Sequence, residues 1–157
     1  MKILITGSEG FIGSHLSERL IKSGYSVNCF VQYNSFGNLG WIDTFPKEIK
    51  NQLNIFQGDL RDLQTLKKAS KGCDAIINLA ALIGIPYSYI APKSYIDTNI
   101  IGTMNVLQSA LDNNVEKVIH TSTSEVYGSA QYTPIDELHP LVGQSPYSAS
   151  KIGADNI

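Results

Sequence analysis

The stretch KILITGSEGFIG, residues 2–13, decides the fold of this chain. An apolar run at 3–5 ends at Thr6, three glycines follow at three-residue intervals, and an apolar pattern with helical period then continues to residue 21. This order predicts a buried strand, a tight turn and the start of a helix that ends near residues 23–24.

Each of the three glycines has its own role if a dinucleotide binds at this turn. Gly7 lets the chain leave the strand, Gly10 leaves room for a diphosphate, and Gly13 lets the helix pack closely on the strand. The diphosphate would lie at the positive N-terminus of the helix. The spacing is one residue longer at its first step than the usual fingerprint, and glycine-rich turns also occur for structural reasons. The strand before and the helix after favour dinucleotide binding.

Length and composition describe a soluble globular protein. The 157 residues, 43% of them hydrophobic, fit a single domain, and the net charge of −2 gives no reason to expect a nucleic acid or an anionic membrane as partner. No stretch approaches the roughly 20 apolar residues that cross a bilayer, and Met1 leads directly into the first strand, so we expect a cytoplasmic location. Cys29 and Cys73 are expected to be buried thiols, with no metal site.

Strands and helices alternate along the rest of the chain. Further strands are predicted at 26–31, 53–57, 75–79 and 117–120, and helices at 63–71, at about 92–113 and from about residue 145 onward. Residues 33–46 are predicted to form a loop with at most a short helix after it. The alternation predicts an α/β fold, a Rossmann-type doubly wound parallel sheet with right-handed crossovers.

The end of the second predicted strand bears on the choice of cofactor. Rossmann folds usually carry an acidic residue there for the ribose 2′-OH of NAD, or an arginine for the phosphate of NADP. Residues 31–35 contain neither, and Gln32, Asn34 and Ser35 could hydrogen-bond a ribose or, less well, a phosphate. We therefore favour NAD, with NADP as the alternative. Asp59 either meets an adenine edge or serves as a helix N-cap or turn carboxylate.

A second informative region lies in the C-terminal part of the chain. Residues 120–128 read HTSTSEVYG, and Tyr147 and Lys151 follow on a predicted helix, four residues apart and so on one face. An ammonium close to a phenol favours the phenolate, which makes the tyrosine usable as a base near neutrality. This pair alone is common on helix surfaces, but its combination with the glycine turn is specific.

With these motifs the whole chain resembles the extended short-chain dehydrogenase/reductase superfamily, the nucleotide-sugar epimerases and dehydratases. The resemblance rests on Thr6-Gly7-x-x-Gly10-Phe11-Ile12-Gly13, Gly58-Asp59-Leu60, Asn78-Leu79-Ala80-Ala81, Asn99 and Tyr147-x-x-x-Lys151. In particular, residues 33–36, 81–89 and 143–147 resemble the bacterial N-acetylglucosamine-nucleotide 4,6-dehydratases of legionaminic acid biosynthesis.

The resemblance implies a set of cofactor contacts. They are Gly7, Gly10, Phe11, Ile12, Gly13, Gln32, Asn34, Ser35, Asp59, Leu60, Leu79, Ala80, Ala81, Asn99, Tyr147 and Lys151. It also implies substrate contacts from Ile85, Tyr87, Ser88 and Ser124. The tyrosines at 87 and 89 lie in a predicted proline-containing loop, where they either line the sugar pocket or simply pack.

The same resemblance implies an internal redox cycle on tightly held NAD. Tyr147 takes the proton of the sugar O4 while hydride leaves C4, and Thr123 hydrogen-bonds O4. Glu125 removes the C5 proton, water leaves from C6, and hydride returns to C6 to give a 4-keto-6-deoxy sugar. Some dehydratases carry an aspartate where Ser124 stands, so we expect Glu125 to serve both the deprotonation and the protonation of the leaving oxygen.

Two alternatives stay open: a related 4-epimerase or reductase, and a non-catalytic dinucleotide sensor or scaffold, which would need none of the catalytic residues. The resemblance also implies that residues 1–157 are the N-terminal, cofactor-binding part of a longer, homodimeric enzyme. This part lacks the C-terminal substrate domain and is expected to be inactive alone.

Other polar residues carry weaker expectations. Asn99 is predicted to bridge buried groups from within a helix, with a solvent-facing amide as the alternative. His120 is expected in the core or in support of the site, and His15 and His139 at the surface.

Overall fold

The computed structural model describes all 157 residues. Contacts within the chain divide it into two compact units. Unit 1 comprises Met1–Ala80 and Asn105–Thr121, and unit 2 comprises Ala81–Met104 and Ser122–Ile157.

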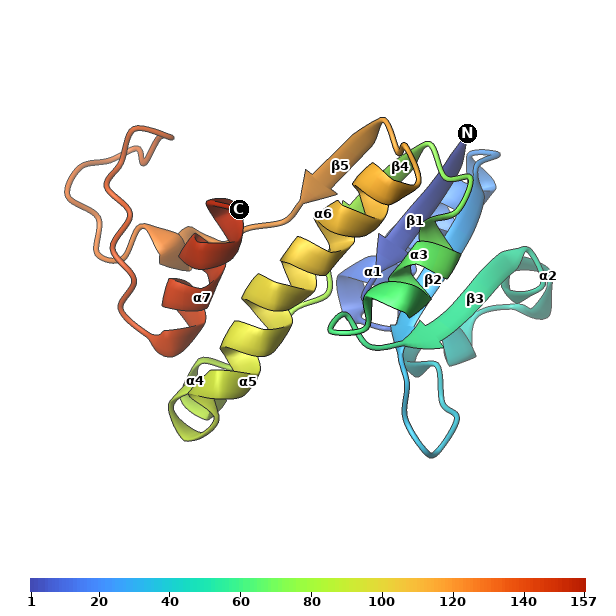
Figure 1. Ribbon diagram of the computed structural model, residues 1–157, viewed down its shortest axis with the longest axis horizontal. Helices are drawn as coiled ribbons and strands as arrows, with labels where there is room; N and C mark the ends of the chain where they lie inside the picture. The colour runs from blue at the N-terminus through green and yellow to red at the C-terminus, as the bar shows by residue number, and fades with distance from the viewer. The chain divides into compact units, whose positions relative to one another are not determined.

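Unit 1 contains a five-stranded parallel sheet, in the order β3-β2-β1-β4-β5 (Figure 1). The chain moves outward from β1 to β3 and then returns to the other side of β1, which is the doubly wound topology that the sequence predicted. The strands are β1 (Lys2–Thr6), β2 (Ser26–Gln32), β3 (Leu53–Gly58), β4 (Ala75–Asn78) and β5 (Lys117–His120).

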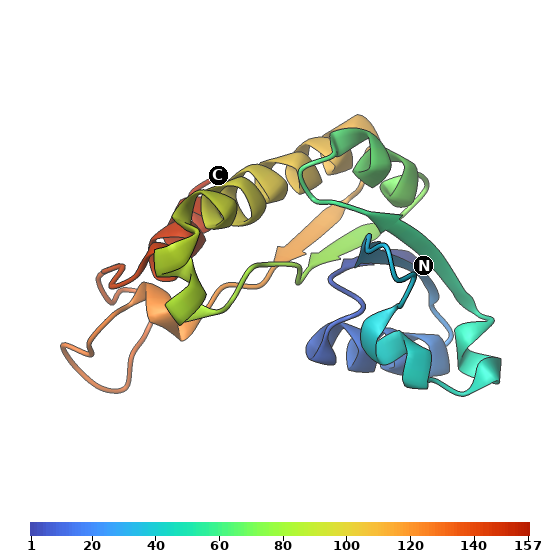
Figure 2. The same ribbon diagram turned by 90° about the horizontal axis from the view of Figure 1, so that it is seen from below.

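Helices cover both faces of this sheet (Figure 2). One face carries α1 (Phe11–Lys22), the 3-10 turn η1 (Gly40–Thr44) and the short α2 (Lys47–Lys50). The other carries α3 (Leu63–Ser70) and the part of α6 (Gly102–Asp112) that belongs to unit 1. The sheet is therefore buried on both sides, as parallel sheets generally are.

The alternation of side chains along β1 explains the two cores. Ile3 and Ile5 pack in the cluster beneath α1, and Leu4 packs in the cluster beneath α3 and α6. All three are at most 5% exposed, so each contributes about 1.5 to 3 kcal/mol through burial. Cys29 and Cys73 are buried free thiols, as predicted, and burial raises the pKa of each.

Unit 2 contains more helix than the sequence predicted. Residues 85–90 form α4 (Ile85–Ile90), where the sequence predicted a loop; Pro86 stands in the first helical turn, the position that tolerates proline. The predicted helix at 92–113 is confirmed with a modification. It consists of α5 (Pro92–Tyr95), the π-helical turn η2 (Ile96–Ile101) and α6, which continues from unit 2 into unit 1. The unit also holds the short 3-10 turn η3 (Ser124–Val126) and α7 (Pro146–Asp155).

Asn99 ties the parts of unit 2 together from within η2. Its side chain accepts the backbone N–H of Leu82 (2.8 Å) and donates to the Leu82 carbonyl (3.0 Å) and to Ser150 Oγ (2.9 Å). The residue is 1% exposed, so its predicted role as a buried bridge is confirmed and the solvent-facing alternative is wrong.

His139 is a correction to the sequence prediction, because it is 2% exposed and not at the surface. Its Nε2 accepts the Gln131 N–H (3.0 Å), and Nδ1 lies 3.1 Å from the Pro140 carbonyl. The rings of Tyr127 and Tyr132 contact the imidazole. Hydrophobicity patterns did not reveal this because the residue is buried by an irregular loop. His15 is exposed, as predicted.

None of the helices combines the length and apolar character that crossing a bilayer requires. No group of three or more histidine, cysteine, aspartate or glutamate side chains is arranged to hold a metal ion.

Candidate functional site

The glycine turn between β1 and α1 depends on two glycines for its own folding. Gly7 has φ +68°, in the left-handed region, and a Cβ there would lie 2.9 Å from Ala80 Cα. A Cβ on Gly13 would lie only 2.1 Å from the Gly7 carbonyl oxygen, so glycine allows the close approach of helix and turn. Glycine is therefore required for backbone conformation and close packing at Gly7, and for close packing at Gly13, as the sequence predicted.

Gly10 differs, because most of the space beside it is open. A Cβ would meet only the Gly7 carbonyl oxygen, at 3.3 Å. Gly10 is also the N-cap of α1 and supplies no side-chain cap, and the next residues, Phe11 and Ile12, are 61% and 66% exposed. A helix N-terminus without a capping side chain, beside an accessible glycine, fits the diphosphate of a dinucleotide.

Thr6 fixes the adjacent end of β4. Its hydroxyl donates to Asn78 Oδ1 (2.5 Å) and accepts the backbone N–H groups of Leu79 and Ala80 (3.1 Å each). These bonds end the strand at Asn78, one residue before the predicted end. They also hold Ala80, a predicted cofactor contact, beside Gly7, and they fix the N–H of Leu79, another predicted contact.

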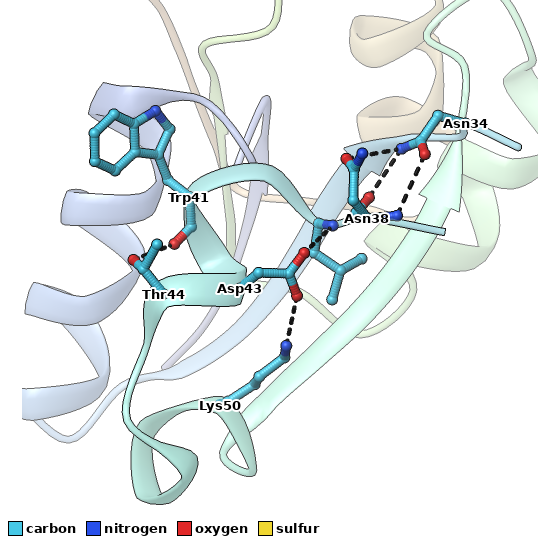
Figure 3. A network of polar contacts seen from close by, with 7 residues as sticks. Asn34, Asn38, Trp41, Asp43, Thr44 and Lys50 are labelled. Atoms are coloured by element: carbon cyan, nitrogen blue, oxygen red, sulfur yellow. Dashed lines mark hydrogen bonds and ion pairs between the residues drawn. The ribbon is translucent and has the colours of Figure 1, made fainter. Parts of the chain in front are cut away.

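The segment after β2 forms a network of its own (Figure 3). The Asn34 amide donates to the Asn38 carbonyl (2.8 Å) and accepts the Asn38 N–H (3.3 Å), so it closes the loop. Asp43 accepts Lys50 Nζ and the Leu39 N–H, both at 2.6 Å. Of the three residues proposed here for the ribose, Gln32 and Ser35 are exposed.

Asp59 forms a turn after β3. It accepts the backbone N–H and the guanidinium of Arg61, and the latter holds the pKa of Asp59 below its usual value. Asp59 therefore serves as a turn carboxylate, the helix N-cap is Asp62, which accepts the Gln64 N–H, and a contact of Asp59 with the adenine stays a prediction. Leu60 is 5% exposed and belongs to the core under α3.

Tyr147 and Lys151 lie one turn apart on α7, within unit 2. A capping box of Ser145 and Ser148 fixes the start of this helix. Tyr147 is 8% exposed, with its ring edge-on to Tyr95 at 6.3 Å, and Lys151 is 3% exposed. Burial lowers the pKa of Lys151, and the charge of Asp155 partly opposes this.

Thr123 and Glu125 belong to η3, also in unit 2. Thr123 caps this turn by accepting the Glu125 N–H at 3.3 Å. Ser124 and Glu125 are exposed. The glutamate thus has a fixed backbone and an accessible carboxylate, which suits a group that must meet a ligand.

The four predicted substrate contacts have different surroundings. Ile85, Tyr87 and Ser88 lie on α4, and Ser124 lies on η3. Tyr87 is 54% exposed and its ring centre lies 6.4 Å from that of Tyr95, so it both packs and stays accessible. Ser88 is fully buried, and its hydroxyl donates to the Ile85 carbonyl at 2.6 Å.

Two further predicted residues are half-buried. Ala81 is half-buried at the start of unit 2. His120, at the end of β5, is half-buried in unit 1, with Nδ1 3.0 Å from Asn78 Nδ2, in agreement with its predicted supporting position.

Glu9 is a residue that the sequence prediction missed. Its Oε1 accepts the N–H of Gln32, the last residue of β2, at 3.0 Å, and its Oε2 is buried without a hydrogen-bond partner. An acidic residue inside the glycine turn was the available signal, because its side chain starts beside the ends of β1 and β2.

Comparison with known proteins agrees with this geometry. The family described as GDP-mannose 4,6 dehydratase matches residues 4–157. Protein CapI of Staphylococcus aureus is 37% identical over 96% of this chain and 46% of its own. The chain spans about half the length of the curated relatives it matches.

Two solved structures show the same fold. DesIV from Streptomyces venezuelae, a dTDP-glucose 4,6-dehydratase crystallised with NAD, is 36% identical with a TM-score of 0.85, over 99% of this chain and 50% of its own. A UDP-glucose 4-epimerase from Thermotoga maritima is 27% identical with a TM-score of 0.87, over 99% and 49%. The chain therefore belongs to the GDP-mannose 4,6-dehydratase family, within the extended short-chain dehydrogenase/reductase superfamily of NAD-dependent epimerases and dehydratases.

Proposed function

We propose that this chain is the N-terminal, cofactor-binding part of a longer nucleotide-sugar 4,6-dehydratase. The observation that carries the proposal is the exposed Glu125 two residues after Thr123, on a turn of fixed backbone. A dehydratase needs a carboxylate to remove a proton from carbon, whereas a 4-epimerase does not. The glycine turn and the buried Tyr147 and Lys151 support use of NAD.

The proposed reaction assigns a proton or a hydrogen bond to each residue. Bound NAD supplies the hydride acceptor and donor. Tyr147, one helical turn from Lys151, takes the O4 proton, and Thr123 hydrogen-bonds O4. Once C4 is a ketone the C5 proton is acidic, and Glu125 takes it. Glu125 then passes this proton to O6, since the Ser124 hydroxyl is too weak an acid to do so. When the hydride returns to C6, C5 takes a proton from solvent, and the O4 proton held by Tyr147 is released to solvent, so that only water is lost overall.

The proposed substrate is N-acetylglucosamine linked to UDP or GDP, and the product is its 4-keto-6-deoxy derivative. Residues 33–36, 81–89 and 143–147, which resemble dehydratases of such sugars, support this choice. We also propose a homodimer for the full-length enzyme, on the same resemblance.

A 4-epimerase is the second candidate, because one of the two structural relatives above acts as one. A non-catalytic sensor is the third. The burial of Lys151 argues against a sensor. Burial disfavours the charged form of the lysine, and a protein that only binds a dinucleotide has no need of a buried lysine at this position.

Mass spectrometry of the full-length enzyme with UDP- or GDP-N-acetylglucosamine, without added reductant, tests the proposal. We expect the loss of one water from at least one substrate. An unchanged mass with an inverted C4 centre would identify an epimerase, and NAD binding with no conversion of either sugar would favour a sensor.

A further inference from the structure

Within unit 1, the carboxylate of Glu9, a residue of the glycine turn, lies at the end of β2. In Rossmann folds the acidic residue that binds the ribose hydroxyls stands on the second strand itself. Here β2 ends in Gln32, which carries no charge, but the Gln32 N–H binds Oε1 of Glu9 at 3.0 Å. The Glu9 carboxylate therefore occupies the end of β2 although it belongs to the glycine turn.

The second oxygen of this carboxylate has no donor from the chain. Oε2 of Glu9 is buried and lacks a hydrogen-bond partner. A buried oxygen without a hydrogen-bond donor destabilises the protein, and more so when the oxygen carries charge. A hydroxyl group from a ligand would remove this destabilisation.

Two other carboxylates of unit 1, one on η1 and one after β3, already form ion pairs. Asp43 binds Lys50 and the Leu39 N–H, as Figure 3 shows, and Asp59 binds the guanidinium and N–H of Arg61. Glu9 forms no ion pair. Its charge is therefore the one left to act on a ligand at the end of β2.

Glu9 is also held in position by its backbone. The Trp41 N–H donates to the Glu9 carbonyl at 2.9 Å, and a Cβ on Gly40 would lie 2.5 Å from that oxygen and 3.0 Å from Glu9 Cβ. The 40–41 segment thus packs directly on Glu9. The terminal torsion of a glutamate is soft, so Oε2 can turn toward a ligand while the backbone stays in place.

We propose that the Glu9 carboxylate accepts hydrogen bonds from the adenosine ribose hydroxyls of NAD, in place of the acidic residue that β2 lacks. The inference rests on the proposed use of a dinucleotide. It further assigns cofactor specificity to Glu9, because a 2′-phosphate would meet a negative charge at this position. No lysine or arginine occurs between Lys22 and Lys47 to compensate that repulsion.

Calorimetric titration of the nucleotide-free, full-length protein with NAD and with NADP tests this inference. The wild type should bind NAD at least about 100-fold more tightly than NADP. Glu9→Gln keeps an oxygen for the Gln32 N–H but removes the charge, and should reduce this ratio by about tenfold or more. Glu9→Ser, which removes the carboxylate entirely, should do the same. Glu48→Gln, an equal change of charge on the exposed α2, should leave the ratio unchanged.

The outcomes separate the two proposals. Circular dichroism first establishes that Glu9→Gln and Glu9→Ser are folded. If the wild type binds NAD and both variants keep the wild-type preference for NAD over NADP, the role of Glu9 is refuted and the proposed function stands. If the wild type binds neither dinucleotide, both proposals are refuted.

Discussion

The Thr6 hydroxyl donates a 2.5 Å hydrogen bond to Asn78 Oδ1, joining the ends of two adjacent strands, and both residues are at most 1% exposed. The same hydroxyl accepts the Leu79 and Ala80 N–H groups. One side chain thus sets the edge of the sheet at which the glycine turn begins.

Removing this hydroxyl should destabilise unit 1. Thr6→Val keeps the shape but takes one donor and one acceptor from a buried network, at about 1 to 3 kcal/mol for each lost partner. We expect the free energy of unfolding to fall by about 2 to 4 kcal/mol in urea titrations. Thr6→Ser, which restores the hydroxyl, should recover most of the loss; equal stability of Thr6→Val and wild type would contradict the role of this network.

Gly10→Ala should separate cofactor binding from folding. The new methyl group enters mostly open space, and the φ of −74° suits alanine, so the melting temperature should change little. NAD affinity should fall by at least about tenfold, because the methyl group occupies the place of the diphosphate. Gly13→Ala is the contrasting variant and should fail to fold stably, since its Cβ would lie 2.1 Å from the Gly7 oxygen. Unaltered NAD binding by Gly10→Ala would place the diphosphate elsewhere.

Lys151 should give the protein a characteristic pH dependence. Burial lowers its pKa in the folded state, so the unfolded chain holds the proton more tightly, up to its ordinary pKa of 10.5. Stability therefore rises with pH between the folded-state pKa and 10.5, by about 1.4 kcal/mol for each unit of difference. The free energy of unfolding of the wild type, relative to Lys151→Met, should increase from pH 7 to pH 10. A constant difference would show that the ammonium is not desolvated.

Glu125→Gln should block water loss without unfolding the protein. The side chain is exposed, so stability should change by less than about 0.5 kcal/mol. The rate of keto-sugar formation by the full-length enzyme should fall at least about 100-fold, the usual contribution of a general acid or base. Glu137→Gln, an equal change at another exposed position of unit 2, serves as the control. Wild-type rates in Glu125→Gln would remove the assignment.

His139→Phe should loosen the loop around it. Phenylalanine keeps a ring beside Tyr127 and Tyr132 but cannot accept the Gln131 N–H or donate to the Pro140 carbonyl. We expect faster amide hydrogen exchange at Gln131 and a loss of about 1 to 3 kcal/mol in stability. Unchanged exchange at this amide would show that the histidine does not hold the loop.

Much of the sheet followed from local sequence. The strand at 117–120 was predicted to the residue, and the other four strands to within one residue at each end. Short apolar segments between amphipathic helices form few structures other than buried parallel strands. The glycine turn followed for the same reason, since Gly7 and Gly13 meet backbone constraints that a pattern reveals.

Features that depend on tertiary contacts were not predictable in this way. Helix α4 was missed because Gly84 and Pro86 favour a loop when read locally, whereas the Tyr95 hydroxyl holds the start of the helix by donating to the Gly84 carbonyl. The burial of His139 and the position of the Glu9 carboxylate likewise depend on groups distant in sequence, Tyr127 and Gln32.

The most direct test of the proposed dehydratase follows a deuterium label at C4 of the nucleotide-linked N-acetylglucosamine. With the full-length enzyme and no added reductant, the account predicts a product that has lost water and carries the deuterium at C6, measured by NMR. Deuterium that remains at C4 of an epimerised sugar of unchanged mass, or that is released from the sugar altogether, would contradict it.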